Sequence, residues 1–264
     1  MHIEGYIASL FIGISLGLIG GGGSILTVPV LVYMFGINPV LSTSYSLFIV
    51  GSTSLIGAIN NHRKNLVRIK VALLFGLSSI TTVFVTRKII LPVIPEKLFT
   101  VDGFTVTHSL ATMVLFAILM IMAAIAMITN NPLKQNKKIS SETSLAILLL
   151  YGVAVGLATG LLGAGGGFLL IPTLVLFVGL PMKEAVGTSL LIIALNSLIG
   201  FTGDLGHFKI DWLFLCTITL IAVTGIILGG VLSKKIKGEK LKKGFGWFVL
   251  IMAITTLMKE IFFS

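Results

Sequence analysis

Two glycine-rich stretches decide the fold: Gly17-Leu18-Ile19-Gly20-Gly21-Gly22-Gly23 near the start, and Gly160-Leu161-Leu162-Gly163-Ala164-Gly165-Gly166 in the second half. The shift of 143 positions that puts Gly17 on Gly160 also aligns Pro29 with Pro172 and Gly36 with Gly179, without a gap. Ser54-Leu55-Ile56-Gly57 likewise falls on Ser197-Leu198-Ile199-Gly200. Shared apolar low complexity would not keep prolines and glycines in one register. The chain therefore contains an internal repeat.

The surrounding composition is typical of a protein that is embedded in lipid. Of its 264 residues, 56% are hydrophobic and 11% are charged, whereas about 25% are charged in soluble domains. A helix needs about 20 mostly apolar residues to cross the hydrocarbon core. Runs of nearly that length or more cover residues 107–128, 211–232 and 245–262, and further apolar segments cover 3–19, 45–59, 71–85, 144–162 and 186–201. The sequence predicts an all-α polytopic membrane protein.

Several other classes of protein are disfavoured by the residues present. Cys216 is the only cysteine, so an intrachain disulfide is excluded and a cysteine-based metal site is not expected. The sequence has no H-E-x-x-H motif and no paired intramembrane aspartates, so we expect neither an enzyme nor a bound metal or cofactor. The formal net charge of +10 lies in short loops between apolar segments. We interpret it as a topology signal rather than as a nucleic-acid surface.

Loop charges predict that the two halves are inverted relative to each other. The loop after the Ser-Leu-Ile-Gly element carries four basic residues in the first half, whereas the equivalent loop carries Asp204, Lys209 and Asp211. One segment later the bias reverses, because residues 87–102 mix both signs and residues 234–243 are rich in lysine. By the positive-inside rule, the loops of Arg63, Lys138 and Lys235 face the cytoplasm and both termini lie outside.

Inversion requires an odd number of crossings in each half. We expect a first transmembrane repeat at residues 1–129, a cytoplasmic linker at 130–142 and a second repeat at 143–264. Each half has either five crossings, or three spanning helices plus a glycine-broken helical hairpin that returns to its own side. We favour the hairpin because its second arm, residues 24–36 or 167–180, is too short to span comfortably at about 1.5 Å per residue.

The glycine clusters are the predicted functional site. Broken backbone is tolerated at membrane depth only where protein buries it or where it lines a watery cavity. A helix that starts after such a break presents unpaired N–H groups and partial positive charge to an anion. Inverted-repeat transporters use paired breaks in this way. The predicted substrate-binding glycines are Gly21, Gly22, Gly23, Gly165, Gly166 and Gly167. The alternative is that these glycines only let helices pack closely.

Uncharged polar side chains complete the predicted site. They are Ser24, Ser46, Thr188, Ser189 and Asn196, of which the repeat pair Ser46 and Ser189 is the first choice. Each could instead bond its own helix backbone or bridge two helices. Asp204 and His207, at the predicted outer end of a helix, could exchange protons for coupling. The alternative for this pair is a solvated helix cap.

The two glycine-rich stretches, each ending at a proline (Pro29 and Pro172), followed by Val186-Gly187-Thr188-Ser189-Leu190, resemble the TauE/SafE sulfite exporter family, also called the toluene-sulfonate uptake permease family. The resemblance covers nearly the whole chain. It implies a permease for sulfite, organosulfonates or related sulfur-containing anions, with a proton-coupled or uncoupled cycle, and we expect it in a prokaryotic inner membrane. We expect export, because a negative-inside potential drives anions outward, and alternating access, because the glycine-rich breaks are paired. Tyr45 departs from the family pattern, since it stands where the second half has Thr188, and could narrow the site.

Two other functions stay open at this point. One is a transporter or channel for another small solute or a cation, which would require intramembrane carboxylates or rings of acidic residues. The other is a structural membrane protein that transports nothing. The sequence names a small anion and the lipid bilayer as partners, excludes nucleic acid, and leaves the oligomeric state open.

Overall fold

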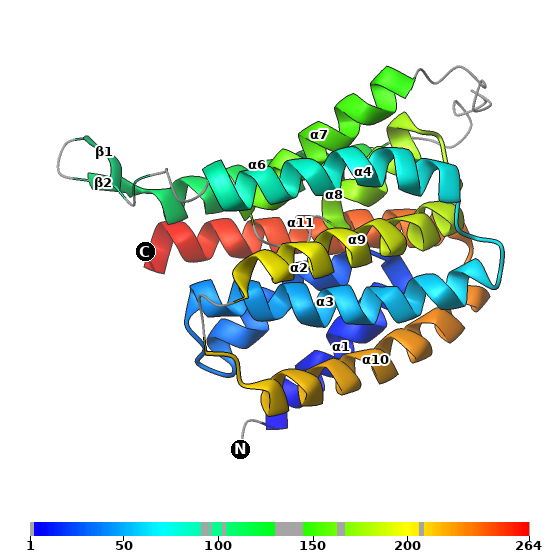
Figure 1. Ribbon diagram of the computed structural model, residues 1–264, viewed down its shortest axis with the longest axis horizontal. Helices are drawn as coiled ribbons and strands as arrows, with labels where there is room; N and C mark the ends of the chain where they lie inside the picture. The colour runs from blue at the N-terminus through cyan, green and yellow to red at the C-terminus, as the bar shows by residue number, and fades with distance from the viewer. Residues whose placement is uncertain are drawn as a thin grey trace.

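The computed structural model describes residues 3–90, 95, 97–101, 104–129, 145–162, 167–205 and 209–263, whose helices lie side by side in an elongated bundle (Figure 1). The first half contains α1 (Ile3–Ile19), α2 (Gly22–Tyr33), α3 (Pro39–His62), α4 (Ile69–Val85) with its π-helical extension η1 (Thr86–Ile90), and α6 (His108–Thr129). The second contains α7 (Leu145–Leu162), α8 (Gly167–Pro172) with the π-helical η3 (Thr173–Phe177), α9 (Met182–Asp204), α10 (Trp212–Lys235) and α11 (Gly238–Phe263). The predicted α-helical fold of a polytopic membrane protein is confirmed, with one short β-hairpin in addition.

Each half contains three long helices after its glycine-rich stretch, as predicted. They are α3, α4 and α6 in the first half and α9, α10 and α11 in the second. The apolar run at 245–262 is only part of α11, because the helix starts earlier, at Gly238. The sequence analysis did not anticipate the antiparallel hairpin of β1 (Lys97–Val101) and β2 (Phe104–Thr107), which extends beyond the helices in Figure 1. The domain boundaries stay predictions.

Among the described residues, four helical segments are long and apolar enough to cross a membrane: Leu41–His62, Ile69–Ile90, Met182–Asp204 and Trp212–Lys235. On α10, Leu213 (82%), Leu220 (66%) and Ile227 (47%) form an exposed apolar stripe at seven-residue spacing. The opposite face of α10 is buried. Water would penalise so much exposed leucine and isoleucine, whereas lipid does not. This pattern is that of an integral membrane protein.

Glycines set the closest helix contacts, and these contacts repeat between the halves. A Cβ added to Gly13 of α1 would lie 2.0 Å from the carbonyl oxygen of Ala222 on α10. The residues 143 positions away are Gly156 of α7 and Ser79 of α4, where the same distance would be 2.7 Å. The α1–α10 and α7–α4 pairs are therefore equivalent, and each joins one helix of the first half to one of the second.

The central pair, α3 and α9, is made of equivalent helices. A Cβ on Gly57 would lie 3.1 Å from Leu190 Cδ1, and a Cβ on Gly200 would lie 3.5 Å from Leu47 Cδ1. These two contacts are related by the same shift of 143 positions. Because early residues of α3 meet late residues of α9, the two helices are antiparallel.

The short arms end in the same way. Gly36 and Gly179 are repeat equivalents, and both adopt positive φ, at 67° and 77°. The residue after each glycine donates its backbone N–H to the carbonyl oxygen six positions earlier, from Ile37 to Leu31 at 3.1 Å and from Leu180 to Leu174 at 2.9 Å. Glycine is the usual residue just after a helix end because it adopts the left-handed conformation without strain. This turn stops both short helices before the long central ones begin.

The basic loops gather at one end of the bundle. The α3–α4 and α10–α11 connections lie at the right in Figure 1. Burial, and then the positive charge of Lys234 in the last turn of α10, lower the pKa of Lys64 in the α3–α4 loop. α7 starts at this end too, because it runs parallel to α4 through the contacts of Gly152 with Phe75 and of Gly160 with Thr86. The predicted linker at 130–142 lies outside the described residues.

Candidate functional site

The first glycine-rich stretch is a tight turn between two antiparallel helices. Gly20 follows α1 with φ +82°, a conformation that side chains with a Cβ rarely adopt. Gly21 is the N-cap of α2 and supplies no capping side chain. A Cβ on Gly23 would lie 2.4 Å from the carbonyl oxygen of Ile12, which places α2 directly against α1. The hairpin predicted from the sequence is present here.

The two halves meet at the predicted break. A Cβ added to Gly21 would lie 2.0 Å from the carbonyl oxygen of Gly167, the first residue of α8. A Cβ added to Gly167 would lie 2.6 Å from Gly21 Cα and 2.8 Å from Ile193 Cδ1. The backbones at the two breaks therefore touch in the buried interior, and no ligand fits between these two residues in this conformation. Gly165 and Gly166 lie outside the described residues.

The start of α2 is an uncapped helix terminus that faces the protein interior. Its first turn contains Gly22, Gly23 and Ser24, whose backbone N–H groups have no partner within the helix. The Ser24 hydroxyl donates to Gly21 O at 2.8 Å, and the Thr27 hydroxyl donates to Gly23 O at 3.0 Å. Both hydroxyl protons are thus held by the backbone, and the N–H groups remain the donors that could bind an anion.

Ser189 is next to the first break. A Cβ on Gly20 would lie 3.0 Å from Ser189 Oγ, and the Ser189 hydroxyl donates to Val186 O at 3.0 Å. Ser46, its repeat equivalent, is buried on α3. Thr188 lies elsewhere, because its hydroxyl accepts the backbone N–H of Arg68 at 3.0 Å, near the end of the bundle. The structure thus brings Ser189 to a break, whereas the Thr188 hydroxyl binds the residue that precedes α4.

Asn196, a predicted site residue, is buried in a polar region whose other members were not predicted. Its Nδ2 donates to Ser79 Oγ on α4 at 2.8 Å. Asn196 Oδ1 and the hydroxyls of Thr53, Ser54 and Ser197 are buried and have no hydrogen-bond partner among the described residues. The repeat shift relates Thr53 to Asn196 and Ser54 to Ser197, in the middle of the α3–α9 pair. The matched Ser54 and Ser197 of the repeat were the signal that could have identified them.

The predicted proton-coupling pair is only partly described. Asp204 is the last residue of α9, and His207 lies outside the described residues. The other described acids also stand within about one turn of a helix end: Glu4, Glu184, Asp211, Glu239 and Glu260. In the part of the chain that the structure describes, no three His, Cys, Asp or Glu residues are grouped so that they could hold a metal ion.

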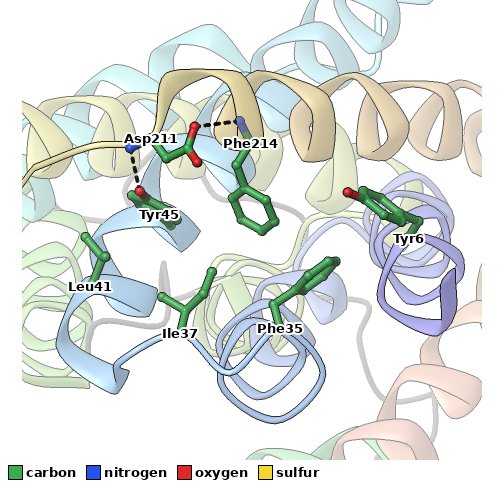
Figure 2. A pocket seen from close by; sticks show the side chains of 7 residues that line it. All are labelled: Tyr6, Phe35, Ile37, Leu41, Tyr45, Asp211 and Phe214. Carbon is green, nitrogen blue, oxygen red and sulfur yellow. Dashed lines mark hydrogen bonds between the residues drawn. The ribbon is translucent and has the colours of Figure 1, made fainter. Parts of the chain in front are cut away.

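A pocket of about 330 Å³ opens at the end of the bundle opposite the basic loops. Figure 2 shows Asp211 above it, with its backbone N–H directed to the Tyr45 hydroxyl at 2.7 Å and its carboxylate to Phe214 N at 3.1 Å. Tyr45, which the resemblance suggested as a narrowing residue, lines this pocket rather than a break. The remaining lining residues are Tyr6, Phe35, Ile37 and Leu41.

At the basic end, an ion pair lies at the repeat positions that correspond to the pocket residues Asp211 and Leu41. Arg68 Nε lies 2.6 Å from Glu184 Oε2, and a second guanidinium nitrogen lies 2.9 Å from Oε1. The hydrogen bonds to Glu184, and then its charge, raise the pKa of Arg68 above its ordinary value. This pair links the start of α4 in the first half to the start of α9 in the second.

Comparisons with known proteins agree over almost the whole chain. The model of the family described as "Sulfite exporter TauE/SafE" matches residues 6–256. A "probable membrane transporter protein" of Xylella fastidiosa is 28% identical, with 98% of each chain covered. "Probable membrane transporter protein YunE" of Bacillus subtilis is 25% identical over 96% of this chain and 93% of its own. A probable membrane transporter protein of Methanocaldococcus jannaschii is 36% identical over 116 residues, 42% of this chain and 43% of its own. No solved structure matches the chain.

Proposed function

The chain belongs to the sulfite exporter TauE/SafE family, and we propose that it exports sulfite or a related sulfur-containing anion by alternating access between two inverted halves. Its relatives are named as probable membrane transporters, and the chain is an integral membrane transporter. We propose further that the two halves are inverted, that the basic loops face the cytoplasm and that the protein lies in a prokaryotic inner membrane.

The contact between Gly21 and Gly167 is the observation that carries this proposal. Gly21 is the N-cap of α2 and Gly167 is the first residue of α8, and their backbones meet in the interior. We assign anion binding to N–H groups around the breaks, from Gly21 to Ser24 and from Gly165 to Gly167, with Ser46, Ser189 and Asn196 beside them. In the conformation described, the contact excludes a ligand between the two breaks. The halves must then separate there for an anion to enter, as alternating access requires.

The antiparallel packing of α3 against α9 supports inversion. A repeat axis along the membrane normal would make equivalent spanning helices parallel, whereas an axis in the membrane plane makes them antiparallel. The gathering of the Arg63 and Lys235 loops at one end supports a cytoplasmic assignment for that end. A membrane potential that is negative inside drives anions outward, at about 2.3 kcal/mol per charge per 100 mV, so export needs no coupled ion.

A cation carrier is the less favoured alternative. Cation pathways in membranes commonly use carboxylates within the spans, and the described acids of this chain stand near helix ends. Uncharged hydroxyls and backbone N–H groups suit an anion that is bound without a buried counter-charge.

The test is efflux from liposomes that contain the purified protein and are loaded with sulfite, thiosulfate or methanesulfonate in turn. We expect faster efflux of at least one anion than from protein-free liposomes, and its loss in the Gly23→Val/Gly166→Val variant. Ser189→Ala, which removes one hydroxyl beside the break, should slow efflux while leaving the fold intact. Equal efflux with and without protein for all three anions would refute the sulfur-anion proposal.

A further inference from the structure

The two ends of the bundle use the same backbone contact. At one end the Arg68 N–H donates to the Thr188 hydroxyl at 3.0 Å, and at the other the Asp211 N–H donates to the Tyr45 hydroxyl at 2.7 Å. The shift of 143 positions relates Arg68 to Asp211 and Tyr45 to Thr188. In the first case the residue before α4 of the first half is bonded to α9 of the second half. In the second case the residue before α10 of the second half is bonded to α3 of the first half.

The side chains at these equivalent positions differ, and this difference separates a closed end from an open one. Arg68 makes a two-point ion pair with Glu184. Their equivalents at the other end are Asp211 and Leu41, which cannot form an ion pair. Both line the pocket of about 330 Å³, and Figure 2 shows them on two sides of it. Beyond the shared backbone contact, one end therefore has an ion pair between the halves where the other has a cavity.

The ion pair has the properties of a reversible closure. Two parallel N–H···O bonds between a guanidinium and a carboxylate fix geometry as well as charge. The Arg68 side chain is 55% exposed and that of Glu184 is 18% exposed, so water reaches the pair. An exposed pair of this kind contributes little net stability, and it can open without leaving a buried charge behind.

We propose that the Arg68–Glu184 ion pair is the gate of the basic end, closed in the state in which the Asp211 end is open. This inference rests on the proposed alternating access, but not on which anion is carried. Arg68 and Glu184 act as positioning residues, since they hold the halves together and do not bind the anion. When the pair breaks, the start of α9 is free to move away from the start of α4.

The test measures how fast cysteines at the two ends react with a hydrophilic maleimide, in detergent and without substrate. In a Cys216→Ser background, Leu41→Cys reports the pocket, and Leu66→Cys, whose backbone carbonyl contacts Gly187 beside the ion pair, reports the basic end. We expect Arg68→Gln to raise the Leu66→Cys rate and to lower the Leu41→Cys rate. Each change should be about two- to fivefold, the shift that an exposed ion pair can supply.

Two further variants keep the test specific. The charge exchange Arg68→Glu/Glu184→Arg should return both rates to within about twofold of the parent, because it restores the pair. Lys70→Gln removes the same charge two residues away, in the first turn of α4, and should change neither rate. If Arg68→Gln leaves both rates unchanged, raises both, or shifts them in the opposite directions, the gate proposal is wrong. Because no substrate is present, this result is independent of the sulfite efflux test.

Discussion

Replacing Gly21 by alanine tests the contact on which the site depends. The new Cβ would lie 2.0 Å from Gly167 O and 2.3 Å from Gly167 C, both of them backbone atoms that cannot rotate away. A carbon and an oxygen that are not bonded require about 3 Å or more, so the two breaks must separate by about 1 Å. Inserting a methyl group into such a tight contact costs about 1–3 kcal/mol.

The measurement is thermal unfolding of the purified protein, followed by the fluorescence of Trp212 and Trp247. At about 3 °C per kcal/mol for a chain of this size, Gly21→Ala should lower Tm by about 3–9 °C. Sulfite efflux should fall as well, because the halves can no longer close at the breaks. Gly167→Ala should have a similar effect, since its Cβ would lie 2.6 Å from Gly21 Cα.

The matched control is Gly76→Ala on α4, where an added Cβ would meet nothing within 4 Å. Alanine is favoured over glycine within a helix, so Tm should stay level or rise. If Gly21→Ala unfolds at the parent temperature and transports normally, the breaks do not touch as described. An equal fall in Tm in Gly76→Ala would show that any added methyl group destabilises the protein, and the effect of Gly21→Ala would then not be evidence for a contact between the breaks.

Two further substitutions test other contacts. Ser79→Ala removes the acceptor of Asn196 Nδ2 (2.8 Å) from a buried site, which should cost about 1–3 kcal/mol of stability and lower Tm. Ser78→Ala is the control and should leave Tm unchanged, because the Ser78 hydroxyl donates within its own helix at 3.0 Å. An unchanged Tm in Ser79→Ala would count against the Asn196–Ser79 bond. Gly13→Ala places a Cβ 2.0 Å from Ala222 O and should lower Tm by several degrees, because it forces α1 away from α10. Gly203→Ala, whose Cβ would meet nothing within 4 Å, should leave Tm unchanged. Equal Tm values for the two variants would contradict the close packing of α1 against α10.

The repeat carried most of what could be predicted from the sequence. Lipid excludes unpaired backbone, so apolar runs had to be helices, and α6 and α10 follow the predicted runs at 107–128 and 211–232 closely. The helical runs could be predicted because composition and backbone conformation act over a few residues. The contact of Gly21 with Gly167 is long-range, so the expectation that the two breaks face each other came from the repeat, and anion binding there stays a prediction.

Other features depend on which helices become neighbours, and a single sequence does not give that information. Thr188 and Ser189 were both predicted as polar residues of one site, but adjacent residues on a helix point in different directions. Thr188 therefore accepts a bond from Arg68, whereas Ser189 lies near Gly20. The partnership of Asn196 with Ser79 was likewise hidden, since it joins helices more than a hundred residues apart.

The exchange of helices between the halves also constrains how the protein is made. The glycine face of α1, which includes Gly13, is completed only by α10, near Ala222. At about 5–20 residues per second, ribosomes need roughly 10–40 s to reach that partner. During that time the close-packing surface of α1 has no permanent neighbour in the bilayer. A gene cut between the two repeats would give two products that each lack the partner of their first helix, so they would have to assemble before either could pack fully.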